Sequence, residues 1–555
     1  MNKDDFNKIT INSSNLDLDN FNSSKFKIDL NRVAFIFIVI FIIIILYSTR
    51  IIYLSSKTFE KRIYISNQIN RADITDRNGN YVSKSVLTTN VGIDPKLVKD
   101  KEKLLIKLQY TFPKQNISEI KKKLYGKKFF YIQKQVTPER FEKIKLLGEK
   151  SIRLEPKITR IYPDKNLFSH LLGQIDNDNN GISGIEKTFD NKLKDGRKQL
   201  VLTLDKELQF IIRNELLNAQ NVFKNIGGTG ILMNVNNGEI LSLVSIPDFD
   251  LNQRKSISDR KYINRATKGV YELGSVFKTF TIAAGLNYGL ISSNDMFMNL
   301  EKKMKCGGRI ISEYDEDLPK DLTVEDILIN SSNIGSVKIG QIIGEKKMKE
   351  FLGLIGILNK MEFDIEEVGT PLPFTWNDCK LKTVSYGHGI TTTPLQLAKG
   401  YAILSNGGYQ VNPTLIKKKY DISKRKKILN SDVSAKINSI LRKVVTNGTA
   451  SLSDVEGYEV GGKTGTAQLV ENGLYTNKKI NTFASVFPIS DPKYVLVILL
   501  EDTKLSKNYV YKYRNKPGSF EGTPFNTAGW TSVEIVGNII DKIGPILATK
   551  YMDLQ

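Results

Sequence analysis

Three short segments carry the residue types that acyl transfer through a serine would require. The first is Ser275-Val276-Phe277-Lys278, which follows a glycine-bearing turn and precedes an apolar segment. This pattern predicts that Ser275 begins a helix and that Lys278, about one turn later, lies on the same face. The helix N-terminus would favour negative charge near the serine, and a lysine kept neutral by burial could accept the serine proton.

The Ser-x-x-Lys pattern alone identifies nothing, because it recurs along the chain. It also begins at Ser24, Ser118, Ser258, Ser423 and Ser490. The Ser-x-Asn pattern is equally loose and begins at Ser13, Ser292, Ser331 and Ser506, whereas Lys-Thr-Gly occurs once, at Lys463.

Order and context distinguish three of these segments from the others. Ser331-Ser332-Asn333 follows Ser275 by 56 residues, directly after the helix-like segment TVEDILINS. Lys463-Thr464-Gly465-Thr466 comes 132 residues after Ser331, just before a pair of strand-like segments. The other occurrences lack such contexts, so the ordered set is the candidate active site.

The surrounding segments predict a sheet covered by helices. Residues 206–221 have helical apolar spacing behind Asp205, a good N-cap. Asn236-Asn237-Gly238 between two apolar runs is a strong hairpin signal, and the apolar runs 483–487 and 494–500 form another pair. The stretch 533–546 has a helical pattern. We therefore expect an α+β domain with an antiparallel sheet at residues 201–555.

The N-terminal part of the chain contains an apolar segment. Residues 33–49 carry no charge, and residues 51–54 extend the segment if Arg50 reaches toward the membrane surface. A buried core helix or a cleaved signal peptide are alternatives, but the run is uniformly apolar, has a long polar stretch before it and lacks an A-x-A-like site after it. We expect an uncleaved transmembrane anchor at residues 33–54, a disordered cytoplasmic tail at 1–32 and the remainder outside.

Composition narrows the classes of partner. The net charge of +22 favours anionic partners, but no nucleic-acid-binding motif is present, so a membrane surface is favoured over nucleic acid. Cys306 and Cys379 leave open one disulfide or two free thiols. His170 and His388, the two histidines, stand alone in the sequence and give little material for a histidine-based triad or a histidine-rich metal site.

The ordered set resembles the class B penicillin-binding proteins, the monofunctional peptidoglycan transpeptidases. The resemblance extends over nearly everything after the anchor, although Ala72 replaces a usual glycine. The Tyr271–Lys278 segment is similar to division enzymes of alphaproteobacterial type and favours the septal branch over the elongation branch. The further segments that carry the resemblance are Arg71–Gly79, Arg160-Ile161-Tyr162-Pro163 with His170 and Gly173, Gly184–Lys187 with Phe189, Ser385–Gly389 with Thr393–Gln396, and Thr527-Ala528-Gly529-Trp530.

The resemblance implies a role for each candidate residue. Ser275 would attack the carbonyl of the penultimate D-alanine of a stem peptide, with Lys278 as general base. Ser331 would carry the proton to the leaving amine, and Asn333 would bind the substrate amide and steady Lys278.

The third segment would hold the substrate. Lys463 would supply positive charge, while Thr464 and Thr466, on either side of Gly465, would bind the terminal carboxylate. The backbone N–H groups of Ser275 and Thr466 would form the oxyanion hole.

The resemblance also implies an architecture and partners. A pedestal of the penicillin-binding protein dimerisation type would occupy residues 55–200, and a serine β-lactamase-like transpeptidase domain residues 201–555. The ligands would be stem peptides ending in D-Ala-D-Ala and β-lactams, and no metal or cofactor would be needed. A membrane glycosyltransferase and divisome proteins would be partners. Alternatives are an elongation-type transpeptidase, a D,D-carboxypeptidase or β-lactamase-like hydrolase, and a non-catalytic β-lactam sensor or scaffold.

Overall fold

The computed structural model describes residues 30–66, 71–113, 115–136, 138–176, 178–253, 259, 262–417, 425–471 and 473–551. The chain forms two units, divided between Ile69 and Asn70. Most of the expected N-terminal tail, residues 1–29, lies outside the described residues.

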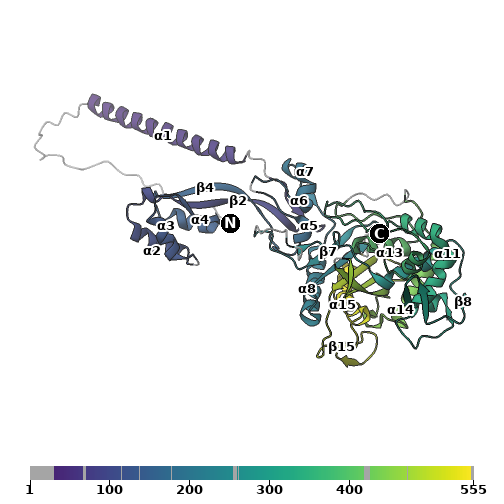
Figure 1. The fold of residues 1–555 in the computed structure, drawn as a ribbon. Coiled ribbons are helices and arrows are strands. Elements are labelled where there is room, and N and C mark those ends of the chain that lie inside the picture. Colours follow the sequence, from purple (N-terminus) through teal and green to yellow (C-terminus); the bar gives the residue numbers. More distant parts are fainter. Residues whose placement is uncertain are drawn as a thin grey trace, which may run out of the picture. The chain divides into compact units, whose positions relative to one another are not determined.

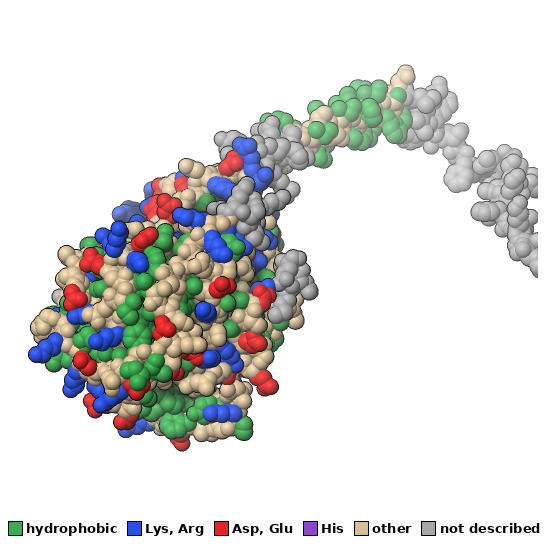
Figure 2. All heavy atoms as spheres, turned by 90° about the vertical axis from the view of Figure 1, so that its right-hand side faces the viewer, with side chains coloured by type: hydrophobic (Ala, Val, Ile, Leu, Met, Phe, Trp, Pro, Cys, Tyr) green, Lys and Arg blue, Asp and Glu red, His purple; other side chains and the backbone are tan. Residues whose placement is uncertain are grey.

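The first unit contains one long helix, α1 (Leu30–Ser66). Its segment Asn31–Leu54 is apolar, exposed and 24 residues long, which corresponds to about 36 Å of helix against a hydrocarbon core of about 30 Å. Apolar side chains cover this segment in Figure 2. The helix is long and apolar enough to cross a membrane, and it begins three residues before the expected start of the anchor.

The second unit begins with a sheet of five strands in the order β3-β2-β1-β5, with β4 paired to β2. The strands are β1 (Ile74–Thr75), β2 (Tyr81–Ile93), β3 (Phe130–Val136), β4 (Ile152–Ile161) and β5 (Leu200–Val201). The helical segments of this region are η1 (Pro95–Leu97), α2 (Lys101–Thr111), α3 (Ile117–Leu124), α4 (Pro138–Lys145), α5 (Ser169–Leu172), α6 (Gly184–Thr188) and α7 (Asp190–Lys194). The C-terminal end of β2 and the N-terminal end of β4 pack with α2 and α3 in a second, smaller hydrophobic core.

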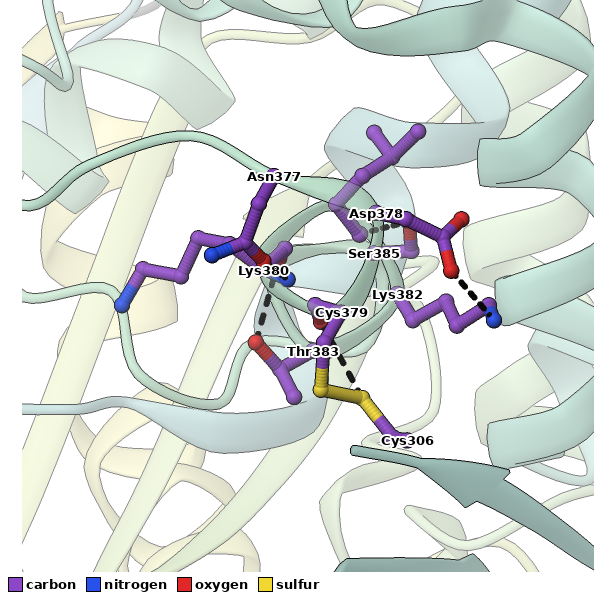
Figure 3. Close-up of a disulfide and its surroundings, with 9 residues drawn as sticks. Cys306, Asn377, Asp378, Cys379, Lys380, Lys382, Thr383 and Ser385 are labelled. Atoms are coloured by element: carbon purple, nitrogen blue, oxygen red, sulfur yellow. Dashed lines mark hydrogen bonds and ion pairs between the residues drawn. A yellow bond between two sulfur atoms is a disulfide. The ribbon is translucent and has the colours of Figure 1, made fainter. Parts of the chain in front are cut away.

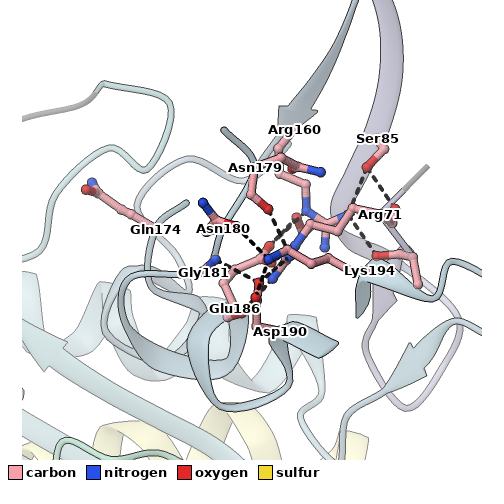
Figure 4. A network of polar contacts seen from close by, with 12 residues as sticks. Arg71, Ser85, Arg160, Gln174, Asn179, Asn180, Gly181, Glu186, Asp190 and Lys194 are labelled. Carbon is pink, nitrogen blue, oxygen red and sulfur yellow. Dashed lines mark hydrogen bonds and ion pairs between the residues drawn. The ribbon is translucent and has the colours of Figure 1, made fainter. Parts of the chain in front are cut away.

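A buried ionic network joins distant segments of this module (Figure 4). The Glu186 carboxylate accepts hydrogen bonds from Arg71 Nε at 2.6 Å and from Arg160 Nε at 2.8 Å. The hydroxyls of Ser83 and Tyr162 donate to the same carboxylate. The conspicuous arginine segments of the sequence therefore meet on one carboxylate and serve the architecture of the module.

The larger part of the second unit, which includes β7 and α15 in Figure 1, is built on an antiparallel sheet. The strand order of this sheet is β12-β13-β14-β6-β7. Its strands are β6 (Gly227–Asn234), β7 (Ile240–Ile246), β12 (Gly461–Glu471), β13 (Leu474–Phe487) and β14 (Tyr494–Glu501). All eight residues of β14 are buried, so both faces of the sheet are covered. Helices α8 (Lys206–Phe223) and α15 (Ser532–Tyr551) contact each other and the sheet, and α13 (Pro394–Ser405) contacts β6, β13 and β14.

The remaining elements lie between β7 and β12 or close to the C-terminus. They are η3 (Gly274–Phe277), α9 (Lys278–Asn287), β8 (Met296–Phe297), β9 (Lys303–Cys306), β10 (Arg309–Ser312), β11 (Leu322–Thr323), α10 (Val324–Ile329), α11 (Asn333–Leu354), α12 (Asp378–Ser385), α14 (Ser431–Thr446), η5 (Ser451–Ser453), β15 (Val510–Lys512), β16 (Ser519–Glu521) and η6 (Ala528–Trp530). The predicted helix behind Asp205, both strand pairs and the C-terminal helix are confirmed.

The two cysteines form a disulfide, with their Cα atoms 5.1 Å apart (Figure 3). It joins Cys306, at the end of β9, to Cys379 in α12. Of the two possibilities left open by the sequence, the structure therefore has the bridge.

Candidate active site

Ser275 lies in the 3-10 turn η3, which runs directly into α9. The serine thus precedes the α-helix, while Lys278 begins it. Gly274 has φ 65°, a left-handed conformation that suits glycine. Its carbonyl lies against Gly387, where a Cβ would come within 2.0 Å of the Gly274 oxygen. Two glycines therefore let the backbone fold tightly behind a half-buried serine.

Lys278 is completely buried and turns toward Ser331. Its Nζ donates to the Ser331 carbonyl and, at 3.1 Å, to the Ser331 hydroxyl. The Ser275 hydroxyl has no hydrogen-bond partner among the residues that the structure describes. Ser275 and Lys278 lie on adjoining turns, and among the described residues no hydrogen bond joins their side chains.

Lys463 approaches the same hydroxyl from the sheet. It is the third residue of β12 and is completely buried, and its Nζ donates to Ser331 Oγ at 2.9 Å. A longer contact of 3.3 Å reaches the Thr464 carbonyl. The three segments singled out in the sequence therefore meet at the side chain of Ser331.

Burial controls the charge of both lysines. Desolvation lowers the pKa of Lys278 to about 7, although the carboxylate of Glu313 acts in the opposite direction. Desolvation also lowers the pKa of Lys463 well below its usual value, and the neighbouring Lys278 adds to this effect. At neutral pH a large share of Lys278 is therefore uncharged and able to accept a proton.

Ser331 has φ 60°, an uncommon backbone conformation for a residue other than glycine. It lies in the turn between α10 and α11, and Ser332 caps α11 by accepting a hydrogen bond from the Gly335 N–H at 2.9 Å. In this left-handed conformation, both the carbonyl and the hydroxyl of Ser331 accept hydrogen bonds from Lys278.

Asn333 differs from its expected placement. Its Nδ2 donates to the Ser312 carbonyl at 2.8 Å, and within the described residues it makes no hydrogen bond to Lys278. The physical reason is local, because Asn333 opens α11 beside the end of β10. Lys278 is held by Ser331 instead.

The Lys-Thr-Gly segment lies on an edge strand of the large sheet, because β12 pairs only with β13. Gly465 packs so closely on η3 that a Cβ there would come within 2.2 Å of the Leu273 carbonyl oxygen. The Thr464 hydroxyl shares a 2.8 Å hydrogen bond with Thr449, and the Thr466 hydroxyl accepts from the Ala528 N–H at 3.0 Å. The edge strand and the serine turn are therefore in direct contact.

A cluster of aromatic and charged side chains adjoins the serine turn and was not found from the sequence. Glu272 accepts a hydrogen bond from the Tyr475 hydroxyl at 3.1 Å, and His388 Nδ1 lies 3.6 Å from its carboxylate. The His388 ring stacks between Tyr386 and Tyr475. Burial lowers the pKa of His388 despite the opposing charge of Glu272. Two of its segments, Tyr271–Lys278 and Ser385–Gly389, stand out in the sequence, but nothing there indicates that they meet each other and Tyr475.

The second histidine lies elsewhere and has a packing role. His170 Nε2 is 2.9 Å from the Pro247 carbonyl oxygen, and its ring meets Phe249 edge to face. Burial lowers the pKa of His170 to about 4, so it stays neutral at physiological pH. Among the described residues, no group of His, Cys, Asp and Glu is arranged to hold a metal ion.

Comparison with known families gives two matches. Residues 228–518 match the penicillin binding protein transpeptidase domain, and residues 66–215 match the penicillin-binding protein dimerisation domain. The first match contains all of the candidate site residues. The second contains the Arg71, Arg160 and Glu186 network.

Individual relatives agree over most of the chain. A protein of Caulobacter vibrioides named "Probable peptidoglycan D,D-transpeptidase FtsI" is 29% identical, over 86% of this chain and 82% of its own length. The peptidoglycan D,D-transpeptidase FtsI of Buchnera aphidicola subsp. Baizongia pistaciae is 30% identical, over 86% and 92%. The FtsI of Escherichia coli K12 is 28% identical, over 79% and 80%. A peptidoglycan synthetase structure from Bifidobacterium adolescentis has the same fold, with a TM-score of 0.64 at 19% identity over 87% of this chain and 96% of that one.

Proposed function

Because the chain belongs to the penicillin-binding protein transpeptidases, we propose that it is a class B peptidoglycan D,D-transpeptidase that uses Ser275 as its nucleophile. The observation that carries the proposal is the shared hydrogen bonding of two buried lysines to Ser331. Three chain segments converge there beside a half-buried serine on a tight turn.

In the acylation step, neutral Lys278 accepts the proton of the Ser275 hydroxyl. The serine oxygen forms a bond to the carbonyl carbon of the penultimate D-alanine of a stem peptide. The bond from that carbon to the terminal D-alanine nitrogen breaks, and the proton passes through Ser331 to the leaving amine. The position of the Ser331 hydroxyl, within hydrogen-bond distance of both Lys278 and Lys463, supports this relay.

In the second step an amine of a neighbouring stem peptide attacks the acyl-enzyme. A bond forms between that amine nitrogen and the acyl carbon, the bond to Ser275 breaks, and the amine proton returns to the serine oxygen by the reverse route. The products are a cross-linked peptide and the free enzyme. The chemistry needs only acid–base groups and oriented donors, all of which the chain supplies.

The edge strand β12 is suited to hold the donor peptide. An extended peptide can add to an unpaired strand edge through backbone hydrogen bonds. The hydroxyls of Thr464 and Thr466 would then receive its terminal carboxylate, and the negative charge of that carboxylate would favour protonation of Lys463. The N–H groups of Ser275 and Thr466 would bind the oxyanion, a contribution of about 3–4 kcal/mol for a donor in a hydrolase oxyanion hole.

Asn333 is assigned a substrate role only. Its side chain would bind the amide of the stem peptide, which requires it to exchange its present bond to the Ser312 carbonyl. The proposed role in steadying Lys278 passes to Ser331, since that residue makes the contacts.

The chain is anchored by α1, and we assign residues 33–54 to the membrane, 1–32 to the cytoplasm, 55–200 to the pedestal and 201–555 to the extracytoplasmic transpeptidase domain. The Cys306–Cys379 disulfide supports this orientation, because such bonds persist in oxidising compartments. The FtsI relatives and the Tyr271–Lys278 segment support a septal role, with a membrane glycosyltransferase and other divisome proteins as partners.

Incubation of the full-length protein, in detergent, with a labelled penicillin tests the proposal. Intact mass spectrometry should show one stable adduct on the wild type and none on Ser275→Ala, with both proteins folded by circular dichroism. Absence of an adduct on the wild type would refute the acyl-enzyme. Rapid loss of the adduct with penicillin breakdown would indicate a hydrolase instead, and cross-linking of a stem peptide to an added amine distinguishes a transpeptidase from a carboxypeptidase.

A further inference from the structure

Glu313 lies directly after β10 and faces the start of α11. Its carboxylate accepts three hydrogen bonds from consecutive residues. The donors are the Ser332 hydroxyl at 2.6 Å, the Asn333 N–H at 2.6 Å and the Ile334 N–H at 2.9 Å. These three residues immediately follow Ser331, so one carboxylate fixes the chain on the C-terminal side of the turn.

The adjacent residue adds a fourth contact, again with α11 as the donor. Ser312, the last residue of β10, accepts the Asn333 side chain through its carbonyl at 2.8 Å. The end of β10 and the start of α11 are therefore joined by four hydrogen bonds. Ser331 departs from the usual backbone region at this point, with φ 60°, and such a conformation persists when its surroundings hold it in place.

The hairpin that carries Glu313 is itself tethered. Strands β9 and β10 form an antiparallel hairpin, in which Cys306 is opposite Arg309 and Lys303 is opposite Ser312. A disulfide joins Cys306 to Cys379 in α12. The Cys306–Cys379 bridge is drawn in Figure 3. The carboxylate is thus attached to a short, covalently restrained hairpin, which limits the positions that it can take.

We propose that Glu313 is a positioning residue for the transfer reaction, which holds the Ser331 turn so that the Ser331 carbonyl and hydroxyl stay within reach of Lys278 and Lys463. The inference rests on the proposed function. Among the described residues, Glu313 makes no hydrogen bond to Ser275 or to β12, so it acts through the Ser331 turn and through its charge.

Because Glu313 is charged, its positioning role should change the pH dependence of acylation, which a role in packing alone would not do. Among the described residues, the charge that acts on the pKa of Lys278 is the Glu313 carboxylate, whose field favours the protonated amine. Removal of the Glu313 charge therefore lowers the pKa of Lys278. Since acylation requires neutral Lys278, the rise of rate with pH should then occur at lower pH.

Three variants of the full-length protein test the inference by the rate of labelled-penicillin acylation across pH. Glu313→Gln should lower the maximal rate at least about tenfold, because it loses charge-assisted hydrogen bonds, and should move the acid limb to lower pH. Glu313→Asp keeps the charge but is one methylene shorter. Its maximal acylation rate should therefore fall, while the acid limb of its pH profile should stay at the wild-type position. Glu316→Gln, on an exposed side chain three residues away, should match the wild type in both.

The results distinguish a failure of the proposed function from a failure of the proposed role of Glu313. A wild type that forms no adduct refutes the proposed function. A wild type that is acylated, with a Glu313→Gln variant of wild-type rate or with an unshifted limb, refutes the role of Glu313 alone. If Glu313→Gln does not fold by thermal melting, Glu313→Asp decides, since full wild-type rate in that variant contradicts a positioning role.

Discussion

Lys278 and Lys463 donate hydrogen bonds to one and the same hydroxyl, that of Ser331, at 3.1 and 2.9 Å. Two buried ammonium groups this close repel each other, which lowers the pKa of Lys463 beyond the effect of burial. The burial of both amines and this repulsion favour the uncharged form of the lysines. The pair is therefore suited to take a proton from one side of Ser331 and return it on the other.

The first prediction concerns this shared hydroxyl. Ser331→Ala removes the common hydrogen-bond partner and interrupts the relay, so penicillin acylation should slow by about 10²-fold or more, a typical loss for a positioned acid–base group. Stopped-flow or quenched-flow labelling measures the rate. The matched control is Ser292→Ala, because Ser292 also begins a Ser-x-Asn pattern but its side chain is exposed. Equal rates in the two variants would contradict the relay.

The second prediction concerns pH. Lys278 has a pKa lowered by burial to about 7, so it is largely charged below that pH and largely neutral above it. The acylation rate constant of the wild type should accordingly rise with pH through about 7 and not near the usual lysine value of about 10.4. Lys278→Arg should show negligible acylation throughout, because arginine stays protonated.

The control for the pH profile is Lys346→Arg on the exposed face of α11, which should leave it unchanged. A profile that rises only near pH 10 would indicate that Lys278 is not the proton acceptor. A flat profile would indicate that acylation does not depend on a lysine in this range.

Much of the site was predictable because it is encoded in order along the chain. Ser275, Lys278, Ser331 and Lys463 follow one another along the chain, and hydrogen bonds join the last three of them. The turn of Asn333 toward Ser312 was not predictable, since it depends on a hairpin that carries no motif. Glu313 was missed for the same reason. The cysteine pairing depended on spatial approach across 73 residues, which spacing alone does not reveal.

The third prediction concerns the disulfide. Because the bridge closes a loop across 73 residues, its loss should reduce the free energy of unfolding by about 2–4 kcal/mol. Chemical denaturation of the full chain with and without dithiothreitol measures the difference. The double variant Cys306→Ala with Cys379→Ala should match the reduced wild type and show no response to reductant. If the free energy of unfolding of the wild type were the same with and without dithiothreitol, the disulfide would not stabilise the fold.

The last prediction concerns the ionic network of the pedestal. Glu186 is buried between Arg71 and Arg160, so Glu186→Gln leaves Arg160 without its counter-charge and Arg71 with that of Asp190 alone. Breaking a buried pair in this way costs about 3–5 kcal/mol, and the midpoint of thermal unfolding should fall clearly. Glu142→Gln, an exposed carboxylate in α4, is the control and should melt like the wild type. Since the network lies in the module and not at Ser275, the variant should still be acylated by penicillin at a temperature where it is folded. Loss of acylation in a folded Glu186→Gln protein would instead show that the pedestal is coupled to the chemistry of the site.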